Sequence, residues 1–197
     1  ANDPHLTVSM PTLWYQNHIE ARDSGVQVGG ATMPGVPGVI TGHNARIAWG
    51  ITAGRADTQD LYVEQRHPED PASFRYGDAW ERAQVRREEI RVRGQAEAQV
   101  QEVVITRHGP LVNSLLPARE AADLPPLALR WSGHTPGTSL RGLLALQRAG
   151  DWPGFRAALA LVSDPSQNLV YADVDGNIGY QYVARVPRRR SGYGLLP

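Results

Sequence analysis

The most informative pattern of apolar and polar positions lies in residues 167–184. Residues 168–172 and 178–184 are rich in β-branched and aromatic side chains, which favours strands. The segment between them contains Asp175-Gly176, and an Asp-Gly pair between two apolar runs is typical of a tight hairpin turn. The pattern therefore predicts a β-hairpin, and taken alone it favours a structural role over a functional one.

The apolar period changes near residues 138–163, where we predict a pair of helices. Thr138 or Ser139 is a candidate N-cap for the first helix, which ends at Gly150, and Asp151 is a candidate N-cap for the second. Apolar positions recur every three or four residues, as one face of a helix requires. These positions are Leu140, Leu143, Leu144, Phe155, Ala158, Leu159 and Val162.

The remaining chain alternates in shorter runs that Gly and Pro interrupt, which predicts many short strands. We expect a second hairpin at residues 74–80 and a turn at Gly42-His43-Asn44-Ala45. The other predicted strands are residues 26–31, 39–41, 46–52, 60–65, 89–93, 100–107 and 127–131. Because strands and helices occupy separate parts of the chain, the predicted fold class is α+β rather than a βαβ repeat.

Composition excludes several classes of function. The chain has 197 residues, of which 41% are hydrophobic, and a formal net charge of zero, so no overall field draws it to nucleic acid or to a membrane surface. It contains no Cys, which excludes disulfides, thiolate catalysis and Cys-ligated zinc. No apolar run approaches the ~20 residues that span a bilayer. The basic cluster at residues 185–190 lacks interleaved aromatic residues, so we interpret it as a solvated loop and expect no nucleic-acid partner.

Two short segments carry candidate chemistry. Gln167 and Asn168 place amide side chains at the mouth of the predicted hairpin, and a fixed amide donor can stabilise a developing oxyanion. Asp57, Gln59 and Asp60 offer carboxylate and carbonyl oxygens of the kind that bind calcium. A polar turn before a strand is the favoured alternative for this second segment. The sequence contains no Gly-rich phosphate loop, and we expect no organic cofactor.

Short segments in a fixed order cover nearly the whole chain. They are Asn2-Asp3-Pro4-His5, Trp14-Tyr15, Pro34-Gly35-Val36-Pro37-Gly38-Val39, Gly42-His43-Asn44, Ile47-Ala48-Trp49-Gly50-Ile51-Thr52, Asp57, Asp60-Leu61-Tyr62, His108-Gly109-Pro110, Gln167-Asn168, Tyr171-Ala172-Asp173, Gly176-Asn177-Ile178-Gly179-Tyr180 and Pro187-Arg188-Arg189. In order and spacing, the chain resembles the penicillin acylase family of N-terminal nucleophile (Ntn) hydrolases. The resemblance implies part of an αββα sandwich, in which two antiparallel sheets lie between helical layers.

The same resemblance implies an amidohydrolase that cleaves an acyl amide, such as a β-lactam side chain or an acyl-homoserine lactone. Residues 1–197 would be a single incomplete domain, the N-terminal part of the large β chain, with the processed α chain and the rest of the β chain as partners. The family's nucleophile is a Ser that self-cleavage exposes as a new N-terminus, and its own α-amine acts as base. Such a Ser would lie upstream of Asn2, so we expect the chain alone to be inactive. A periplasmic or secreted location follows by analogy.

Roles for individual residues also follow from the resemblance. The backbone N–H of Ala53 and the side chain of Asn168 match the two donors of the family's oxyanion hole. His5 matches a position beside the nucleophile. Arg189 matches an Arg that orients the Asn side chain and the N-terminal amine.

The resemblance further implies an acyl pocket and a structural calcium ion. The pocket positions are Leu6, Thr41 and Ile51, and the calcium ligands are Asp57, the carbonyl of Gln59, and Asp60. An alternative from another class stays open, which is a non-catalytic β-rich binding module stabilised by calcium.

Overall fold

The segments with alternating patterns form antiparallel strands in the computed structural model, which describes residues 6, 7 and 9–189. The chain divides into two compact units, the first being Ala1–Asp57 with Thr135–Pro187 and the second Thr58–His134 with Arg188–Pro197. Strands dominate both units and the helix pair belongs to the first, which confirms the α+β class. That residues 1–197 form a single incomplete domain is a statement about the whole protein, and it stays a prediction. Among the described residues, no helix has the length and apolar character needed to cross a membrane.

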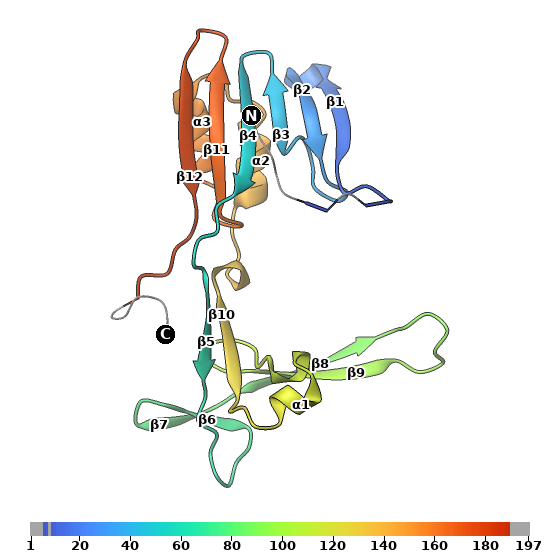
Figure 1. The fold of residues 1–197 in the computed structure, drawn as a ribbon, viewed down its shortest axis with the longest axis vertical. Helices are drawn as coiled ribbons and strands as arrows, with labels where there is room; N and C mark the ends of the chain where they lie inside the picture. The colour runs from blue at the N-terminus through green and yellow to red at the C-terminus, as the bar shows by residue number, and fades with distance from the viewer. Residues whose placement is uncertain (1–5, 8, 190–197) are drawn as a thin grey trace. The chain divides into compact units, whose positions relative to one another are not determined.

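The first unit is built on a six-stranded antiparallel sheet in the order β1-β2-β3-β4-β11-β12. Its strands are β1 (Tyr15–Ala21), β2 (Val26–Thr32), β3 (Thr41–Asn44), β4 (Ile47–Ala53), β11 (Gln167–Asp173) and β12 (Ile178–Val183), and a short 3-10 helix, η1 (Arg22–Ser24), joins β1 to β2. The helices α2 (Ser139–Leu146) and α3 (Trp152–Leu159) cover one face of this sheet (Figure 1). Segments far apart in the chain, β4 and β11, are therefore neighbours at its centre.

The helix pair forms where the apolar period changes. Asp151 caps α3 as predicted, because its carboxylate accepts a hydrogen bond from the backbone N–H of Gly154 at 2.8 Å. Thr138 stands at the N-cap position of α2 but does not cap it, since its hydroxyl donates to the carbonyl of Leu161 at 2.7 Å. That bond ties the start of α2 to the segment that follows α3.

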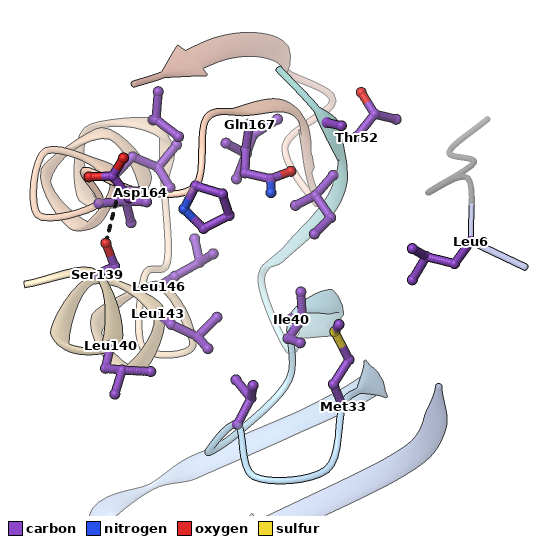
Figure 2. A pocket seen from close by; sticks show the side chains of 18 of the residues that line it. Leu6, Met33, Ile40, Thr52, Ser139, Leu140, Leu143, Leu146, Asp164 and Gln167 are labelled. Carbon is purple, nitrogen blue, oxygen red and sulfur yellow. Dashed lines mark hydrogen bonds between the residues drawn. The ribbon is translucent and has the colours of Figure 1, made fainter. Parts of the chain in front are cut away.

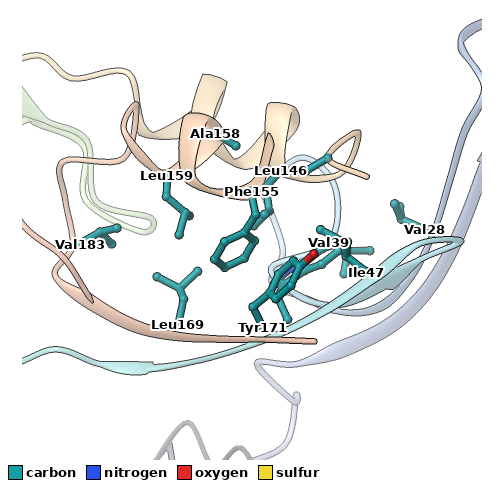
Figure 3. Close-up of a cluster of buried hydrophobic side chains, with 12 residues drawn as sticks. Val28, Val39, Ile47, Leu146, Phe155, Ala158, Leu159, Leu169, Tyr171 and Val183 are labelled. Atoms are coloured by element: carbon teal, nitrogen blue, oxygen red, sulfur yellow. The ribbon is translucent and has the colours of Figure 1, made fainter. Parts of the chain in front are cut away.

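One hydrophobic core lies between the helix pair and the sheet. Phe155 of α3 is fully buried, and its ring centroid lies 4.9 Å from that of Tyr171 on β11. Figure 3 shows Leu159 pointing from α3 toward Leu169 of β11, and Leu146 of α2 belongs to the same cluster. The apolar stripes of the helices and the inward positions of the strands meet here, as amphipathic elements of both kinds require.

The predicted turn at Gly42-His43-Asn44-Ala45 is wrong, because most of it belongs to strand β3. Gly42 pairs with Gly30, and a Cβ on Gly42 would lie only 2.1 Å from the carbonyl oxygen of Gly29, so the close approach of the strands requires glycine there. The chain reverses after Asn44, whose Oδ1 accepts hydrogen bonds from the N–H groups of Arg46 and Ile47 at 2.8 and 2.9 Å.

The hairpin predicted at residues 167–184 is confirmed as β11 and β12. Gly176 has a φ of 89°, in the left-handed region that glycine adopts easily. The Asp173 carboxylate closes the turn, and hydrogen bonds from Asn177, first from its side chain, lower the pKa of Asp173 to about 2. Tyr171 donates to the same carboxylate at 2.8 Å, and its burial together with this bond raises the pKa of Tyr171 to about 12.

The second unit consists of short ladders rather than one sheet. The strand β5 (Gln59–Val63) pairs with β10 (Leu127–Trp131), β6 (Ser73–Tyr76) with β7 (Ala79–Arg82), and β8 (Gln84–Ile90) with β9 (Gln99–Ile105). The connections contain α1 (Ala118–Ala121), η2 (Asn113–Leu115) and η3 (Ser132–His134). The hairpin predicted at residues 74–80 is confirmed as β6 and β7. The strand predicted at residues 89–93 instead begins at Gln84 and ends at Ile90, because residues 84–90 pair with β9.

Candidate active site

The ends of β4 and β11 bring two of the predicted catalytic residues together. In the antiparallel register, Gln167 lies opposite Ala53 and Asn168 lies opposite Thr52. The side-chain nitrogen of Asn168 donates to the carbonyl oxygen of Ala53 at 3.0 Å and to Oγ1 of Thr52 at 3.2 Å. The structure thus places the Asn168 amide beside the Ala53 backbone, although the two residues are far apart in the chain.

Tyr180 of β12 fixes the orientation of the Asn168 amide. Its hydroxyl donates to Oδ1 of Asn168 at 2.7 Å, so the NH2 group of Asn168 faces Ala53 and Thr52. Tyr180 was not predicted as a site residue. The hairpin register provides the missing signal, because Tyr182 lies opposite Asn168 and a residue two positions from that partner is its diagonal neighbour on the same face.

The backbone N–H of Ala53 points away from β11. Gly54 donates its N–H to the Ser166 carbonyl at 2.9 Å, and successive N–H groups of an extended strand point to opposite sides. The pairing of β3 with β4 covers Trp49 and Ala48 and does not extend to Ala53. Within the described part of the chain, the Ala53 N–H therefore has no ladder partner. Because Ala53 is exposed, this N–H is available as a donor.

An apolar cavity of ≈ 800 Å³ is lined by Ala53, whereas Asn168 is not among the described residues of its wall. Figure 2 shows Leu140, Leu143 and Leu146 of α2 on one side of it. Of the predicted pocket residues, Leu6 and Ile51 line the cavity, as do Thr52 and Ala53. Most of the remaining wall is also apolar, contributed by Trp14, Met33, Val36, Ile40, Leu159, Val162, Pro165, Leu169 and Val183. Such a wall suits an apolar group with a polar end at the strand termini.

Thr41, the third predicted pocket residue, is not among the described residues that line this cavity. Its side chain lies on β3 and its hydroxyl donates to the carbonyl of Trp49 at 3.1 Å. This bond joins β3 to β4 at the end of their short pairing. His5, predicted to lie beside the nucleophile, falls outside the described residues.

Arg189 and Asp60 form a buried ion pair in the second unit. Nη2 of Arg189 donates to both carboxylate oxygens of Asp60 at 2.8 and 2.9 Å, and the two side chains are 16% and 10% exposed. Both carboxylate oxygens of Asp60 therefore bond to a guanidinium, and binding of calcium by Asp60 stays a prediction. No group of three or more His, Cys, Asp or Glu residues suited to a metal ion occurs in the described part of the chain.

The comparisons with known proteins agree with this geometry. The family model described as penicillin amidase matches residues 1–197. The chain is 36% identical over its whole length to an acyl-homoserine lactone acylase, QuiP, from Pseudomonas aeruginosa, of which it covers 24%. It is also 36% identical over its whole length to a penicillin acylase 2 proenzyme from Pseudomonas sp. (strain SE83), again covering 24% of it. The chain thus spans about a quarter of the length of these curated relatives.

A solved structure shares the fold as well. The thermostable penicillin G acylase from Alcaligenes faecalis superposes with a TM-score of 0.78 and 30% sequence identity, over 93% of this chain and 32% of that one. The match covers nearly all of both units. The two proteins therefore share their fold over most of this chain.

Proposed function

Because the chain belongs to the penicillin amidase family, we propose that it forms the acyl-binding and oxyanion-binding part of an amidohydrolase. The six-stranded sheet with its helix pair is part of the αββα sandwich of Ntn hydrolases. The observation that carries the proposal is the hydrogen bond of the Asn168 amide to the Ala53 carbonyl, because Ala53 lines the ≈ 800 Å³ apolar cavity. An amide substrate needs both features, a site for its acyl group and donors for its carbonyl oxygen.

The proposed reaction begins with a Ser at the N-terminus of the processed β chain. Its hydroxyl oxygen attacks the carbonyl carbon of the amide while its proton passes to the α-amine of the same Ser, which titrates near neutrality. The electron pair of the C=O bond moves onto the oxygen and forms an oxyanion. The intermediate then collapses, the amine leaves with a proton, and water hydrolyses the acyl-enzyme.

In this proposal, Ala53 and Asn168 bind the oxyanion. The Ala53 N–H has no ladder partner among the described strands, and the NH2 group of Asn168 is held toward Ala53 by the Tyr180 hydroxyl. One Asn168 hydrogen now bonded to the neutral Ala53 carbonyl would bond to the oxyanion, which is a stronger acceptor. A hydrogen bond that strengthens as charge develops stabilises the transition state more than the substrate.

The apolar cavity would hold the acyl group. Leu6 and Ile51 belong to its wall, and the named relatives act on an acyl-homoserine lactone and on penicillin. Both substrate types join an acyl group to an amine through a linear amide. We propose that Thr41 supports this wall from behind through its bond to the Trp49 carbonyl.

The proposal includes a longer precursor, because the chain spans about a quarter of its relatives. A processed α chain and the rest of the β chain would complete the enzyme, in the periplasm or outside the cell. His5 and Arg189 are proposed to orient the nucleophile and its amine, with Arg189 anchored by Asp60. A structural calcium ion stays a separate proposal, checked by the melting temperature with calcium and with a chelator.

The test uses the intact precursor and three forms of it, which are the wild type, Asn168→Ala, and a form with the proposed nucleophilic Ser replaced by Ala. We expect Asn168→Ala to lower kcat about 10²- to 10³-fold for an acyl-homoserine lactone, as the loss of one oxyanion donor does. The Ser variant should neither process nor hydrolyse. Equal hydrolysis by all three forms would refute the proposal, and tight binding without hydrolysis in the wild type would favour the non-catalytic module.

A further inference from the structure

Arg55 has an unusual backbone conformation directly after the proposed oxyanion donor. Its φ is 51°, and it is the one non-glycine residue with a positive φ in the described part of the chain. L-residues with a side chain rarely adopt this region, and such residues cluster at functional sites, where surrounding contacts hold them in place. The conformation is therefore a reason to ask what the Arg55 side chain does.

The residues on both sides of Arg55 are fixed to the start of β11 and to β12. The N–H of Gly54 donates to the Ser166 carbonyl at 2.9 Å, and the N–H of Ala56 donates to the Ser166 hydroxyl at 3.1 Å. The hydroxyl of Tyr182 donates to the Gly54 carbonyl at 3.3 Å. With three bonds around one residue, the backbone has little freedom to release the strain, and the direction of the Arg55 side chain is set in advance.

The Arg55 side chain lines the same cavity as Ala53, and it is exposed. It is the one cationic residue among the described residues of the cavity wall. Its guanidinium makes no hydrogen bond or ion pair with another described residue. An Arg held at the rim of an apolar cavity is suited to bind a carboxylate, because its planar fork matches the two carboxylate oxygens.

The charges on the wall also indicate where an anionic group would lie. Asp164 is the one carboxylate among the described lining residues. Figure 2 shows it beside Ser139 of α2, where its backbone N–H donates to the Ser139 hydroxyl at 3.2 Å. Repulsion by Asp164 disfavours an anion on the α2 side of the cavity. An anionic group would therefore lie on the other side of the cavity, where Arg55 follows Ala53.

We propose that Arg55 is a specificity residue that selects acyl amides with a free carboxylate on the leaving amine, that is, N-acyl amino acids. This inference rests on the proposed function, because it places the acyl group in the apolar cavity and the scissile carbonyl at Ala53 and Asn168. The leaving amine then projects from the cavity toward Arg55. A neutral lactone at the same position would gain nothing from the guanidinium.

The experiment compares an N-acyl-homoserine lactone with its ring-opened N-acyl-homoserine. The two probes share the acyl chain and the amide, and opening the lactone replaces a neutral ester by a carboxylate and a hydroxyl. In the intact wild-type enzyme, we expect kcat/KM to favour the ring-opened probe by up to about fivefold, the scale of one exposed charge pair. The preference should weaken as salt is added, because the pair is exposed to solvent.

Three variants separate the side chain of Arg55 from its backbone. Arg55→Gly accepts the positive φ and removes the side chain, Arg55→Gln removes the charge, and Arg55→Lys keeps it. We expect the first two to lose the preference, measured as the ratio of kcat/KM for the two probes, and Arg55→Lys to keep part of it. Arg141→Gln is the matched control, since Arg141 is an exposed Arg on α2 that does not line the cavity, and it should behave like wild type.

A binding measurement distinguishes failure of this inference from failure of the proposed reaction. Both probes are titrated by calorimetry into the form with the proposed nucleophilic Ser replaced by Ala, with and without Arg55→Gly. A carboxylate preference that depends on Arg55, together with no hydrolysis by wild type, would support the role of Arg55 and refute the reaction. Equal affinity and equal turnover of the two probes, unchanged in Arg55→Gly, would overturn the role of Arg55.

Discussion

The two units of this chain are stabilised in different ways. The first unit buries a continuous set of apolar side chains between its sheet and its helices, among them Val28, Trp49, Phe155, Leu169 and Tyr171. In the second unit, the buried hydrophobic side chains among the described residues are Phe74 and Ala128. Its ladders have two strands each, and a two-stranded ladder is marginal by itself in water.

Polar and aromatic contacts replace the missing core of the second unit. The Glu64 carboxylate is 3% exposed and accepts a hydrogen bond from the Thr106 hydroxyl at 2.5 Å, while Nδ1 of His108 lies 3.0 Å from it. The His108 ring stacks on Tyr62 with centroids 4.1 Å apart. Arg107 bonds to Glu81 and lies over the ring of Tyr76. Such networks depend on every partner being present.

The residues of the proposed chemistry lie on the unit with the larger core. Ala53 and Asn168 lie on β4 and β11, the strands that carry Trp49, Leu169 and Tyr171 into that core. Rigid elements of this kind hold donors in place better than loops do. The polar second unit should respond to different substitutions, and four predictions separate the two.

The largest effect is expected in the core of the first unit. Phe155→Ala removes a fully buried ring and should lower the free energy of unfolding by about 3–5 kcal/mol, because the cavity it leaves cannot close completely. Denaturant unfolding of the protein measures the change. Arg156→Ala, an exposed position on the same helix, is the control and should change stability by less than about 0.5 kcal/mol. Similar values for both would contradict a core at this position.

The next effect concerns the buried network of the second unit. Glu64→Ala leaves Thr106 and His108 without their shared acceptor, and should cost about 1–3 kcal/mol, the usual penalty for buried groups left without a partner. Hydrogen exchange should report faster opening of β5 and β9 with β4 and β11 unchanged. Glu88→Ala, a substitution of an exposed side chain on β8, is the control. Faster exchange in both units would show that they do not open separately.

A smaller effect is expected at the donor itself. Tyr180→Phe removes the hydroxyl that bonds to Oδ1 of Asn168, and the loss of one such bond is worth about 0.5–1.5 kcal/mol. We expect the activation free energy that corresponds to kcat to rise by that amount in the intact enzyme. KM and the melting temperature should stay nearly unchanged, because the ring stays in place. Tyr182→Phe, which loses the longer bond to Gly54, is the comparison. An unchanged kcat in Tyr180→Phe would show that Asn168 needs no orienting partner.

The smallest effect depends on pH and concerns the turn between β11 and β12. The pKa of Asp173 is lowered from its ordinary value of 3.8 to about 2 in the folded state, so its contribution to stability is complete above the ordinary value and is lost as pH falls toward about 2. The protection of the Asp175 and Asn177 amides against hydrogen exchange, relative to their intrinsic rates, should therefore fall in acid. In Asp173→Asn, the same amides should exchange with no such acid step. An identical acid step in the variant would assign it to another carboxylate.

Local patterns were sufficient for several elements. Asp175-Gly176 between apolar runs predicted the hairpin, and Asp151 predicted the start of α3, because turn and cap preferences act within a few residues. The resemblance named Ala53 and Asn168, and the structure brings them together. It did not bring Thr41 to the cavity, since the hydroxyl of Thr41 bonds to the backbone of β4. Gly42 reads as a turn residue in the sequence and instead allows two strands to approach closely.

The sequence by itself determined the strands, the helix pair, the apolar stripes and the kind of chemistry that an amide at residue 168 can perform. The tertiary structure decided which strands meet. The pairing of β4 with β11 places Ala53 beside Asn168, and no local preference specifies it, because partners so distant in the chain are selected by the core they bury together. The bond from Tyr180, the cavity and the conformation of Arg55 all depend on that pairing or on contacts beside it.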